Sequence, residues 1–372
     1  MQSRKTVIIG GGLAGLVSAL QLAAQGVEVT VVEKKHYPFH KVCGEYISNE
    51  VIPYLHSLGV YPEALAPSVI NKFLLSSPSG QTLHTRLDLG GFGISRYVLD
   101  HHLYQLAKLR GVIFRLQVSV TDVLWHHHGF TVLLSDGTHL QAPVVLGAYG
   151  KRSNLDRKLE RPFFLERSPY LGVKYHLRAQ VPRDTMALHN FEGGYAGVSS
   201  IEEGKVCFCY LTSRFHLKKY GSIQQMEEAV LHKNPHLRQV LTHSEHLYPQ
   251  AEVINEISFA PKASVENHVL MCGDAAGMIT PLCGNGMAMA IHSAKLAADQ
   301  VQMFLHGHQT RQQMEQNYTR LWQKHFSQRV KTGRWVQQLF GQPVLSEMAI
   351  NGLQYSPSLL TAIMRRTHGH PF

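Results

Sequence analysis

The sequence predicts an α/β fold: a helix-flanked parallel sheet, interrupted by a second domain built on a β-sheet and followed by a helical C-terminal region. Two strand–glycine turn–helix units predict the parallel sheet, one at residues 6–24 and one at 269–299. The block from about 160 to 262 alternates apolar and polar residues as strands do. A chain of 372 residues, 44% hydrophobic and 17% charged, can bury two such domains, which excludes a disordered or coiled-coil chain.

The charge balance favours anionic ligands. The chain has 36 Lys and Arg against 26 Asp and Glu, a formal net charge of +10. These basic residues are spread along the chain and do not cluster with aromatic residues, so we expect no nucleic-acid partner. The five cysteines include no CxxC pair, which fits a cytoplasmic protein better than a disulfide scaffold.

The first 35 residues indicate a Rossmann-like nucleotide site. A strand over 6–9 and a helix over 13–24 enclose Gly10, Gly12 and Gly15 in GxGxxG spacing. Such glycines allow a tight turn, the approach of a pyrophosphate and close helix–strand packing. A second strand over 27–32 ends at Glu33, whose carboxylate can hold the ribose hydroxyls of FAD or NAD. The neighbouring residues assigned to the same cofactor site are Leu13, Ala14 and Lys34.

The segment 269–299 favours FAD over NAD. It begins with a buried strand and an acidic turn at Gly273 and Asp274, and its second glycine turn contains Gly284 and Gly286. Asp274 can accept a hydrogen bond from a ribityl hydroxyl. The backbone amides around Gly286 and Met287 begin a long small-residue helix, and this positive dipole end suits a flavin ring that becomes anionic when reduced.

At these residues the sequence resembles the FAD-dependent oxidoreductases built like aromatic hydroxylases, and within them the geranylgeranyl reductase family. The resemblance covers roughly residues 1–300. It rests on the opening glycines with Glu33, on Cys43-Gly44-Glu45, on GISRYVLDHHL with Arg96 and Asp100, and on Gly273 through Gly286. It implies a Rossmann-like FAD-binding domain with an inserted β-sheet substrate domain.

The resemblance also implies which side chains carry the chemistry. A cysteine in the matching motif lines the active site of geranylgeranyl reductases, so the Cys43 thiol either positions substrate and delivers a proton or is a small buried hydrophobe. Glu45 is either a polar anchor in the same site or the cap of a helix beginning near Ser48. We assign Cys43 and Glu45 as the catalytic candidates.

Three further residues are assigned to the cofactor. Lys41 and Arg96 resemble the basic residues that flank the cofactor in this fold and neutralise its pyrophosphate. Val118 is placed against the adenine by its position alone. Histidines gather at 126–128, 243 with 246, and 306 with 308, but neither their spacing nor a neighbouring Cys or carboxylate set completes a tetrahedral site, so no metal is expected.

These patterns divide the chain into three parts. The assigned ranges are 1–69, 89–159 and 263–300 for the discontinuous FAD-binding domain, 70–88 and 160–262 for the β-sheet substrate domain, and 301–372 for the C-terminal helical region. The helical region is interpreted as a cap over both domains, with a peripheral membrane contact beside a lipid-like substrate as the alternative. The sequence leaves the oligomeric state open.

The leading functional hypothesis is a reductase. Reduced FAD, charged by NAD(P)H or another reductant, would transfer hydride to a double bond of a hydrophobic, isoprenoid-like or polyene-like small molecule. No second GxGxxG is present for a resident nicotinamide, so a transient donor site is implied if NAD(P)H is used.

Three alternatives stay open. The first is a monooxygenase that hydroxylates an aromatic or polyketide substrate through a flavin hydroperoxide, although Gly277 stands where such hydroxylases tend to have a histidine. The second is a flavin halogenase, disfavoured because the three tryptophans lie outside a WxWxIP motif. The third is a non-catalytic flavin-binding electron-transfer protein.

Overall fold

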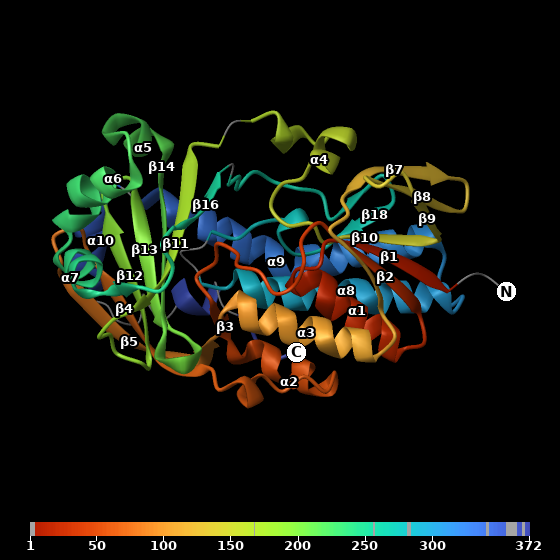
Figure 1. The fold of residues 1–372 in the computed structure, drawn as a ribbon, viewed down its shortest axis with the longest axis horizontal. Coiled ribbons are helices and arrows are strands. Elements are labelled where there is room, and N and C mark those ends of the chain that lie inside the picture. Colours follow the sequence, from red (N-terminus) through yellow and green to blue (C-terminus); the bar gives the residue numbers. More distant parts are fainter. Residues whose placement is uncertain are drawn as a thin grey trace.

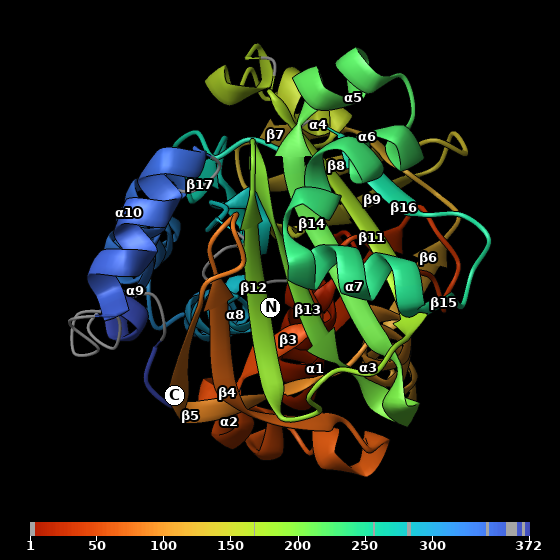
Figure 2. The same ribbon diagram turned by 90° about the vertical axis from the view of Figure 1, so that its left-hand side faces the viewer.

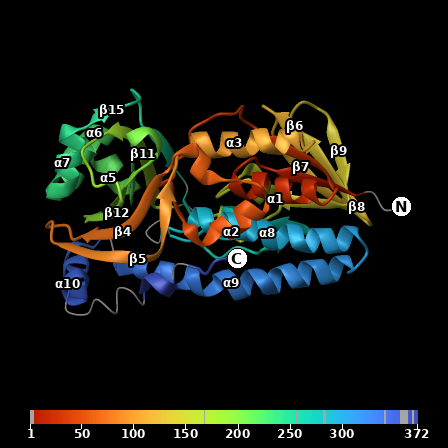
Figure 3. The ribbon, with the colours of Figure 1, turned by 90° about the horizontal axis from the view of Figure 1, so that it is seen from below.

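The computed structural model describes residues 4–339 apart from 167, 256 and 281–283, together with 342–354, 363–366 and 369–372. Two sheet-based domains lie side by side along the long axis, and one long C-terminal helix runs beside both of them (Figures 1 and 3). This arrangement confirms the predicted α/β fold with an inserted sheet domain and a helical C-terminal region.

The first sheet is built around the glycine-rich opening. Its strands lie in the order β17-β18-β10-β1-β2-β6, parallel except for the antiparallel β17. The six strands are Lys5–Ile9 (β1), Glu28–Glu33 (β2), Ile113–Leu116 (β6), Val144–Gly147 (β10), Val265–Glu266 (β17) and Val269–Met271 (β18). Apolar β-branched residues dominate β1, β2 and β10 because both faces of these strands are covered.

Three helices pack around this sheet. They are Leu13–Ala24 (α1), Arg96–Leu109 (α3) and Gly286–Leu305 (α8). The first ten residues of α1 are all buried, because the helix lies against β1 and is itself covered by α3 and α8. A separate antiparallel sheet of Val120–His126 (β7), Gly129–Leu134 (β8) and His139–Ala142 (β9), and a short helix, Asn154–Lys158 (α4), complete this domain.

The second sheet has nine strands in the order β15-β11-β14-β13-β12-β4-β5-β3, with β16 also paired to β11. Its strands are Tyr46–Ser48 (β3), Ser68–Ser76 (β4), Thr82–Gly93 (β5), Tyr170–Arg178 (β11), Thr185–Phe191 (β12), Gly194–Ser200 (β13), Val206–Ser213 (β14), Glu245–His246 (β15) and Glu252–Asn255 (β16). The hairpin at 70–88 therefore joins the sheet of the 160–262 block.

The sheet extends further into the chain than the sequence indicated. Residues 46–48, 68–69 and 89–93 were assigned to the FAD-binding domain, yet they form β3, the start of β4 and the end of β5. The reason is pairing: Tyr46–Ser48 bonds antiparallel to 91–93, a contact between segments more than forty residues apart.

The two faces of the second sheet have different neighbours. Three helices, Arg214–Tyr220 (α5), Ile223–Val230 (α6) and Pro235–His243 (α7), cover the outer face (Figure 2). Leu171, Val173, Leu177 and Phe208 point toward them into one apolar cluster. Because side chains alternate along a strand, Gly172, Lys174 and His176 point the other way, toward the FAD-binding domain.

The C-terminal helices hold the two domains together. Early residues of Arg311–Leu339 (α9), including Tyr318 and Phe326, enter the core of the FAD-binding domain. Val336 near its end, with Ile350 of Pro343–Gln354 (α10), packs under the second sheet. The short helix Ile52–Ser57 (α2) lies beside the β3 end of that sheet (Figure 1).

No helix among the described residues is long and apolar enough to cross a membrane. Val344, Leu345 and Met348 on the outer side of α10 are exposed, so the membrane-surface interpretation of the C-terminal region stays a prediction. Among the apolar residues of this region, Trp322, Phe326, Val330 and Val336 are buried and Trp335 is exposed.

Acid should destabilise the second domain through His189 on β12. Burial lowers the pKa of His189 to about 3, and its Nδ1 lies 2.8 Å from the Ser76 hydroxyl. Between that pKa and the ordinary histidine value of about 6.5 the unfolded chain binds a proton that the folded chain does not, so stability falls as pH falls. In His189→Gln the slope of unfolding free energy against pH should decrease by about 1.4 kcal/mol per pH unit in this window.

Chemical denaturation at a series of pH values measures this slope. His84→Gln, which replaces an exposed ring on β5, is the control and should keep the wild-type slope. An unchanged slope in His189→Gln would show that His189 takes up its proton in the folded protein.

Candidate active site

A cavity of about 570 Å³ lies between the glycine turn of the first domain and the inner face of the second sheet. All the predicted cofactor-site residues except Gly15 line it, and Cys43 and Glu45 do so as well. The cavity is therefore shared by the two domains, and it is within the size range of small-molecule and cofactor sites.

The glycine turn is shaped by backbone approach. Gly10 has φ +100°, and a Cβ there would lie 2.5 Å from the Ala148 carbonyl oxygen. A Cβ on Gly15 would overlap the carbonyl oxygen of Gly10, so this glycine sets the closeness of α1 to β1 and does not reach the cavity. These are the packing roles that the GxGxxG spacing predicts.

Two cations and one buried carboxylate stand beside Gly12. A Cβ on Gly12 would lie 3.5 Å from Lys41 Nζ and 3.6 Å from Arg96 Nη2. Asp100, 2% exposed, accepts hydrogen bonds from both side chains at 2.7–3.0 Å. Burial alone would raise the pKa of Asp100, but the Arg96 and Lys41 charges lower it below its ordinary value. The cluster therefore keeps one net positive charge at the turn, where a pyrophosphate would lie.

Glu33 marks the other side of this turn. Its carboxylate accepts hydrogen bonds from the backbone N–H of Gly11 at 2.8 Å and of Lys35 at 3.0 Å. Each carboxylate oxygen can accept further bonds, so ribose hydroxyls can still donate to it. Lys34 and Val118 line the cavity beside Glu33, and their contact with an adenosine stays a prediction.

The second glycine-rich segment forms the opposite wall. Gly273 and Asp274 follow β18, and Gly284, Gly286 and Met287 stand at the start of α8. Burial raises the pKa of Asp274, despite the lowering effect of the Lys262 charge. Lys262 donates a hydrogen bond to the Asp274 carbonyl oxygen at 2.8 Å, which fixes this turn.

The residues present fit FAD. The N-termini of α1 and α8 both border the cavity. Two helix N-termini, with a cationic cluster at one of them, are features that suit phosphate and an anionic ring.

The predicted catalytic pair lies on the loop between β2 and β3. Cys43 lines the cavity, and burial raises the pKa of its thiol, so the protonated form dominates near neutral pH. Glu45 is fully buried and caps a helix, but not the one near Ser48: its Oε1 accepts from the backbone N–H of Arg96, the first residue of α3, at 2.9 Å. Ser48 caps its own short helix with its hydroxyl.

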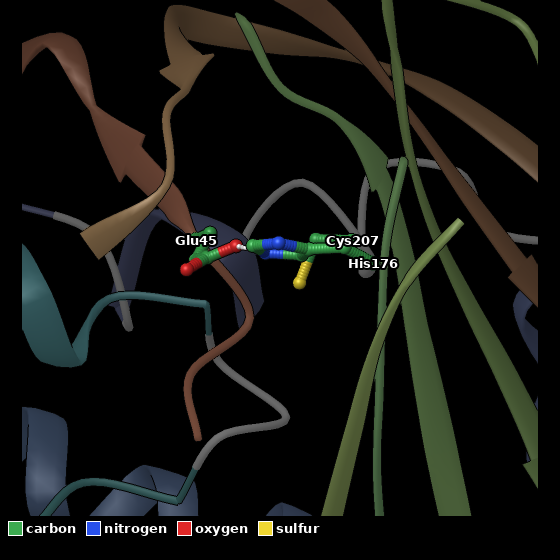
Figure 4. Close-up of side chains that lie close together, drawn as sticks. All are labelled: Glu45, His176 and Cys207. Atoms are coloured by element: carbon green, nitrogen blue, oxygen red, sulfur yellow. Dashed lines mark hydrogen bonds and ion pairs between the residues drawn. The ribbon is translucent and has the colours of Figure 1, made fainter. Parts of the chain in front are cut away.

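Two side chains of β11 hold the carboxylate of Glu45. Lys174 Nζ donates to its Oε1 at 2.5 Å, and His176 Nε2 lies 2.6 Å from its Oε2 (Figure 4 shows the histidine contact). Burial raises the pKa of Glu45, but the Lys174 charge and the His176 contact outweigh this and lower it, so the group is ionised. With both oxygens engaged by groups of β11 and α3, Glu45 acts as an anchor in this arrangement.

Glu45, His176 and Cys207 could together offer three ligand atoms to a metal, all within 4.8 Å of one another (Figure 4). The Lys174 ammonium already bonds the carboxylate and would repel a cation. Burial also raises the pKa of Cys207 well above its ordinary value, and a thiol must lose its proton to bind metal. The cluster is better described as a buried ionic network.

Sequence reasoning missed Lys174, His176 and Asp100 as functional side chains. Asp100 belongs to the matched motif GISRYVLDHHL, but the sequence assigns it no role. A carboxylate four residues after Arg96 on a helix is nevertheless placed to pair with the Arg96 guanidinium. Lys174 and His176 alternate with apolar residues in YLGVKYHLR, a pattern that is equally typical of solvent-facing strand positions.

Comparison with known proteins places this site in context. A family model described as FAD binding domain matches residues 3–330. Menaquinone reductase of Mycobacterium tuberculosis is 24% identical over 325 residues, 80% of this chain and 76% of its own length. Digeranylgeranylglycerophospholipid reductase 1 of Methanosphaera stadtmanae is 24% identical over 324 residues, 80% of this chain and 75% of its own length.

Solved structures share the fold. A geranylgeranyl bacteriochlorophyll reductase-like protein from Thermoplasma acidophilum superposes with a TM-score of 0.79 at 18% identity, covering 97% of this chain and 96% of that one. A flavin-dependent brominase superposes with a TM-score of 0.78 at 17% identity, covering 97% of this chain and 92% of that one. Reductases and halogenases are thus similar in fold, and the fold alone does not select between their reactions.

Proposed function

Because the chain belongs to the FAD binding domain family, we propose that this FAD-dependent oxidoreductase reduces a double bond of an apolar, isoprenoid-like or polyene-like substrate. The general class is common to its reductase, monooxygenase and halogenase relatives. The choice of reduction, and of an apolar substrate, rests on the second-domain wall of the cavity and on Cys43.

The apolar wall is the observation that carries the proposal. Strands β12, β13 and β14 present alternate residues to the cavity, and the segments at 257 and 278 close its side. The wall consists of Met186, Leu188, Tyr195, Gly197, Leu211, Ile257 and Met278. Of these, Leu188, Tyr195, Leu211, Ile257 and Met278 belong to one continuous apolar cluster. A hydrocarbon chain placed there would be removed from water without leaving a polar group unpaired.

The residues at the junction of the two halves suit a reduction. Bound FAD, once reduced by NAD(P)H or another donor, supplies a hydride equivalent. Cys43 lies on the loop at the junction and keeps its thiol proton, so it is placed to protonate the neighbouring carbon of the reduced bond. Lys41 and Arg96, which lie beside Gly12, would hold the cofactor phosphates, and the apolar wall would exclude water.

Hydroxylation and halogenation are less well supported. At position 277, where aromatic hydroxylases tend to carry histidine, a Cβ would lie 2.8 Å from the indole of Trp322. Trp322 therefore occupies the space such a histidine would need. Among the described residues that line the cavity there is no tryptophan, whereas halogenases of this fold carry a tryptophan pair in their motif.

Anaerobic turnover tests the proposal. The FAD-loaded protein, reduced with dithionite, is incubated without oxygen with a panel of polyprenyl alcohols and polyprenyl quinones, and products are analysed by mass spectrometry. We expect addition of one pair of hydrogen atoms per saturated double bond. Product that forms only when oxygen is admitted, with an oxygen atom incorporated, would replace the reductase by the monooxygenase.

The apolar wall predicts a chain-length effect. Gly197 lies at the centre of β13 on the cavity face, and a Cβ there meets nothing closer than the flexible Met186 methyl group at 3.3 Å. Gly197→Phe should therefore fold and fill the cavity. We expect KM to rise about fifteen- to sixty-fold for the longest accepted polyprenyl chain and little for the shortest, since two to three methylenes lose burial at about 0.8 kcal/mol each. An equal change for all lengths would contradict this placement of the substrate.

A further inference from the structure

The loop of residues 40–45, here called the pocket loop, lies between the cofactor turn and the second sheet. It has no regular secondary structure, yet three of its backbone carbonyls accept hydrogen bonds from side chains of the second sheet. Lys174 Nζ donates to the Lys41 carbonyl oxygen at 3.1 Å, and the Ser199 hydroxyl donates to that of Gly44 at 3.2 Å. The Cys207 thiol donates to the Cys43 carbonyl oxygen at 3.3 Å.

All of these donors come from the inner face of the second sheet. Lys174 and His176 lie on β11, Ser199 on β13 and Cys207 on β14, and the strand registers place Cys207 opposite both His176 and Ser199. The inner face is thus divided along its strands. One half is the apolar cavity wall, and the other is a polar patch that binds the pocket loop.

Glu45 at the end of the loop is held in an unusual backbone conformation. Its φ is +54°, a left-handed value that costs a residue with a Cβ free energy unless its surroundings enforce it. Its carboxylate is bonded to Lys174, His176 and the backbone of Arg96, and the side chains of Lys174 and Glu45 are 2% and 0% exposed. Three groups from two elements, β11 and α3, therefore fix this one residue.

We propose that Lys174 and His176, acting through Glu45, are positioning residues that clamp the pocket loop to the second sheet and so fix Cys43 at the cavity. The same clamp fixes Lys41, whose carbonyl binds Lys174 while its ammonium faces the cofactor turn. The second sheet thereby sets the geometry of a loop that belongs to the FAD-binding domain. This role does not depend on which reaction the enzyme performs.

The alkylation rate of Cys43 in the FAD-loaded protein reports how firmly the pocket loop is held. The protein is treated with N-ethylmaleimide, and the modification rate of each cysteine is followed by peptide mass spectrometry. Cys272, which lines the same cavity from the first domain and not from the loop, is the internal reference. In Lys174→Met we expect Cys43 to react about ten-fold faster, because local opening of the loop no longer breaks an ion pair, while Cys272 is unchanged.

The visible spectrum of the bound flavin is the second measurement. Release of a loop that borders the cofactor should shift the absorption bands, whereas a general loss of stability with the loop in place should not. Lys72→Met is the matched control, since Lys72 also pairs with a carboxylate on this sheet, Asp184, but is exposed. It should keep the wild-type spectrum and the wild-type Cys43 rate.

Three results would overturn the proposal. One is equal acceleration of Cys43 and Cys272, which would show general loosening. Another is an unchanged Cys43 rate and spectrum in Lys174→Met. The third is stoichiometric zinc in the purified protein that is lost in His176→Gln, which would make the cluster a metal site. If Lys174→Met does not fold, Ser199→Ala decides: removal of one uncharged clamp bond should accelerate Cys43 about two- to three-fold, and no change contradicts the clamp.

Discussion

Gly12→Asp should produce a folded protein that does not bind FAD. The backbone at Gly12 has φ −84°, which any residue can adopt, and a Cβ there contacts nothing closer than Lys41 Nζ at 3.5 Å. An aspartate carboxylate can then pair with Lys41 and Arg96, in the place where the pyrophosphate would otherwise bind. We expect FAD affinity to fall about a thousand-fold, equivalent to about 4 kcal/mol, with thermal stability kept or raised.

Fluorescence titration of apoprotein with FAD measures this affinity. Gly12→Ala is the control, because a methyl group meets the cations only at ordinary contact distance and adds no charge. Its affinity should fall far less than that of Gly12→Asp. Equal affinity in Gly12→Asp and wild type would mean that the phosphates bind elsewhere in the cavity.

This prediction rests on a part of the site that local sequence already indicates. The bounds of α1 agree with the apolar spacing of residues 13–24, and the roles of Gly10 and Gly15 follow from backbone contacts within one short turn. Such a unit is specified by residues close in sequence, so its pattern is sufficient to predict it.

Contacts between distant segments were not predictable in the same way. The three residues of β3 are too few to show an alternating pattern, and only their pairing with 91–93 makes them a strand. Lys174 is a similar case. A lysine on an alternating strand is normally placed in solvent, and it becomes a buried ion only because Glu45, 129 residues earlier, reaches the same face.

Glu45 shows where a motif predicts importance but not role. The Cys43-Gly44-Glu45 match indicated a residue of the active site, with an anchor or a helix cap as its possible tasks. The structure gives it both at once: it caps α3 through Arg96 and anchors the loop to β11. Which helix a carboxylate caps depends on the path of the chain over the next fifty residues, and the sequence pattern does not contain that path.

Cys43→Ala should slow product formation without slowing reduction of the flavin. Burial keeps the thiol protonated, so in the proposed reaction its contribution is a proton delivered next to the carbon that receives hydride. Loss of a positioned general acid costs about a hundred- to a thousand-fold in rate. The flavin half-reaction with the electron donor involves no such proton, and it should proceed at the wild-type rate in stopped-flow measurements.

Two comparisons separate proton delivery from packing. Cys209→Ala removes a thiol of the same size from the same cavity, so it reports the cost of lost contact alone, and we expect a change of less than about five-fold. Cys43→Ser keeps an O–H group, and it should recover part of the lost rate with a larger solvent isotope effect, because the hydroxyl is a weaker acid than the thiol. If Cys43→Ala and Cys209→Ala lose the same factor, Cys43 is a wall residue, and the proton comes from water or from the substrate itself.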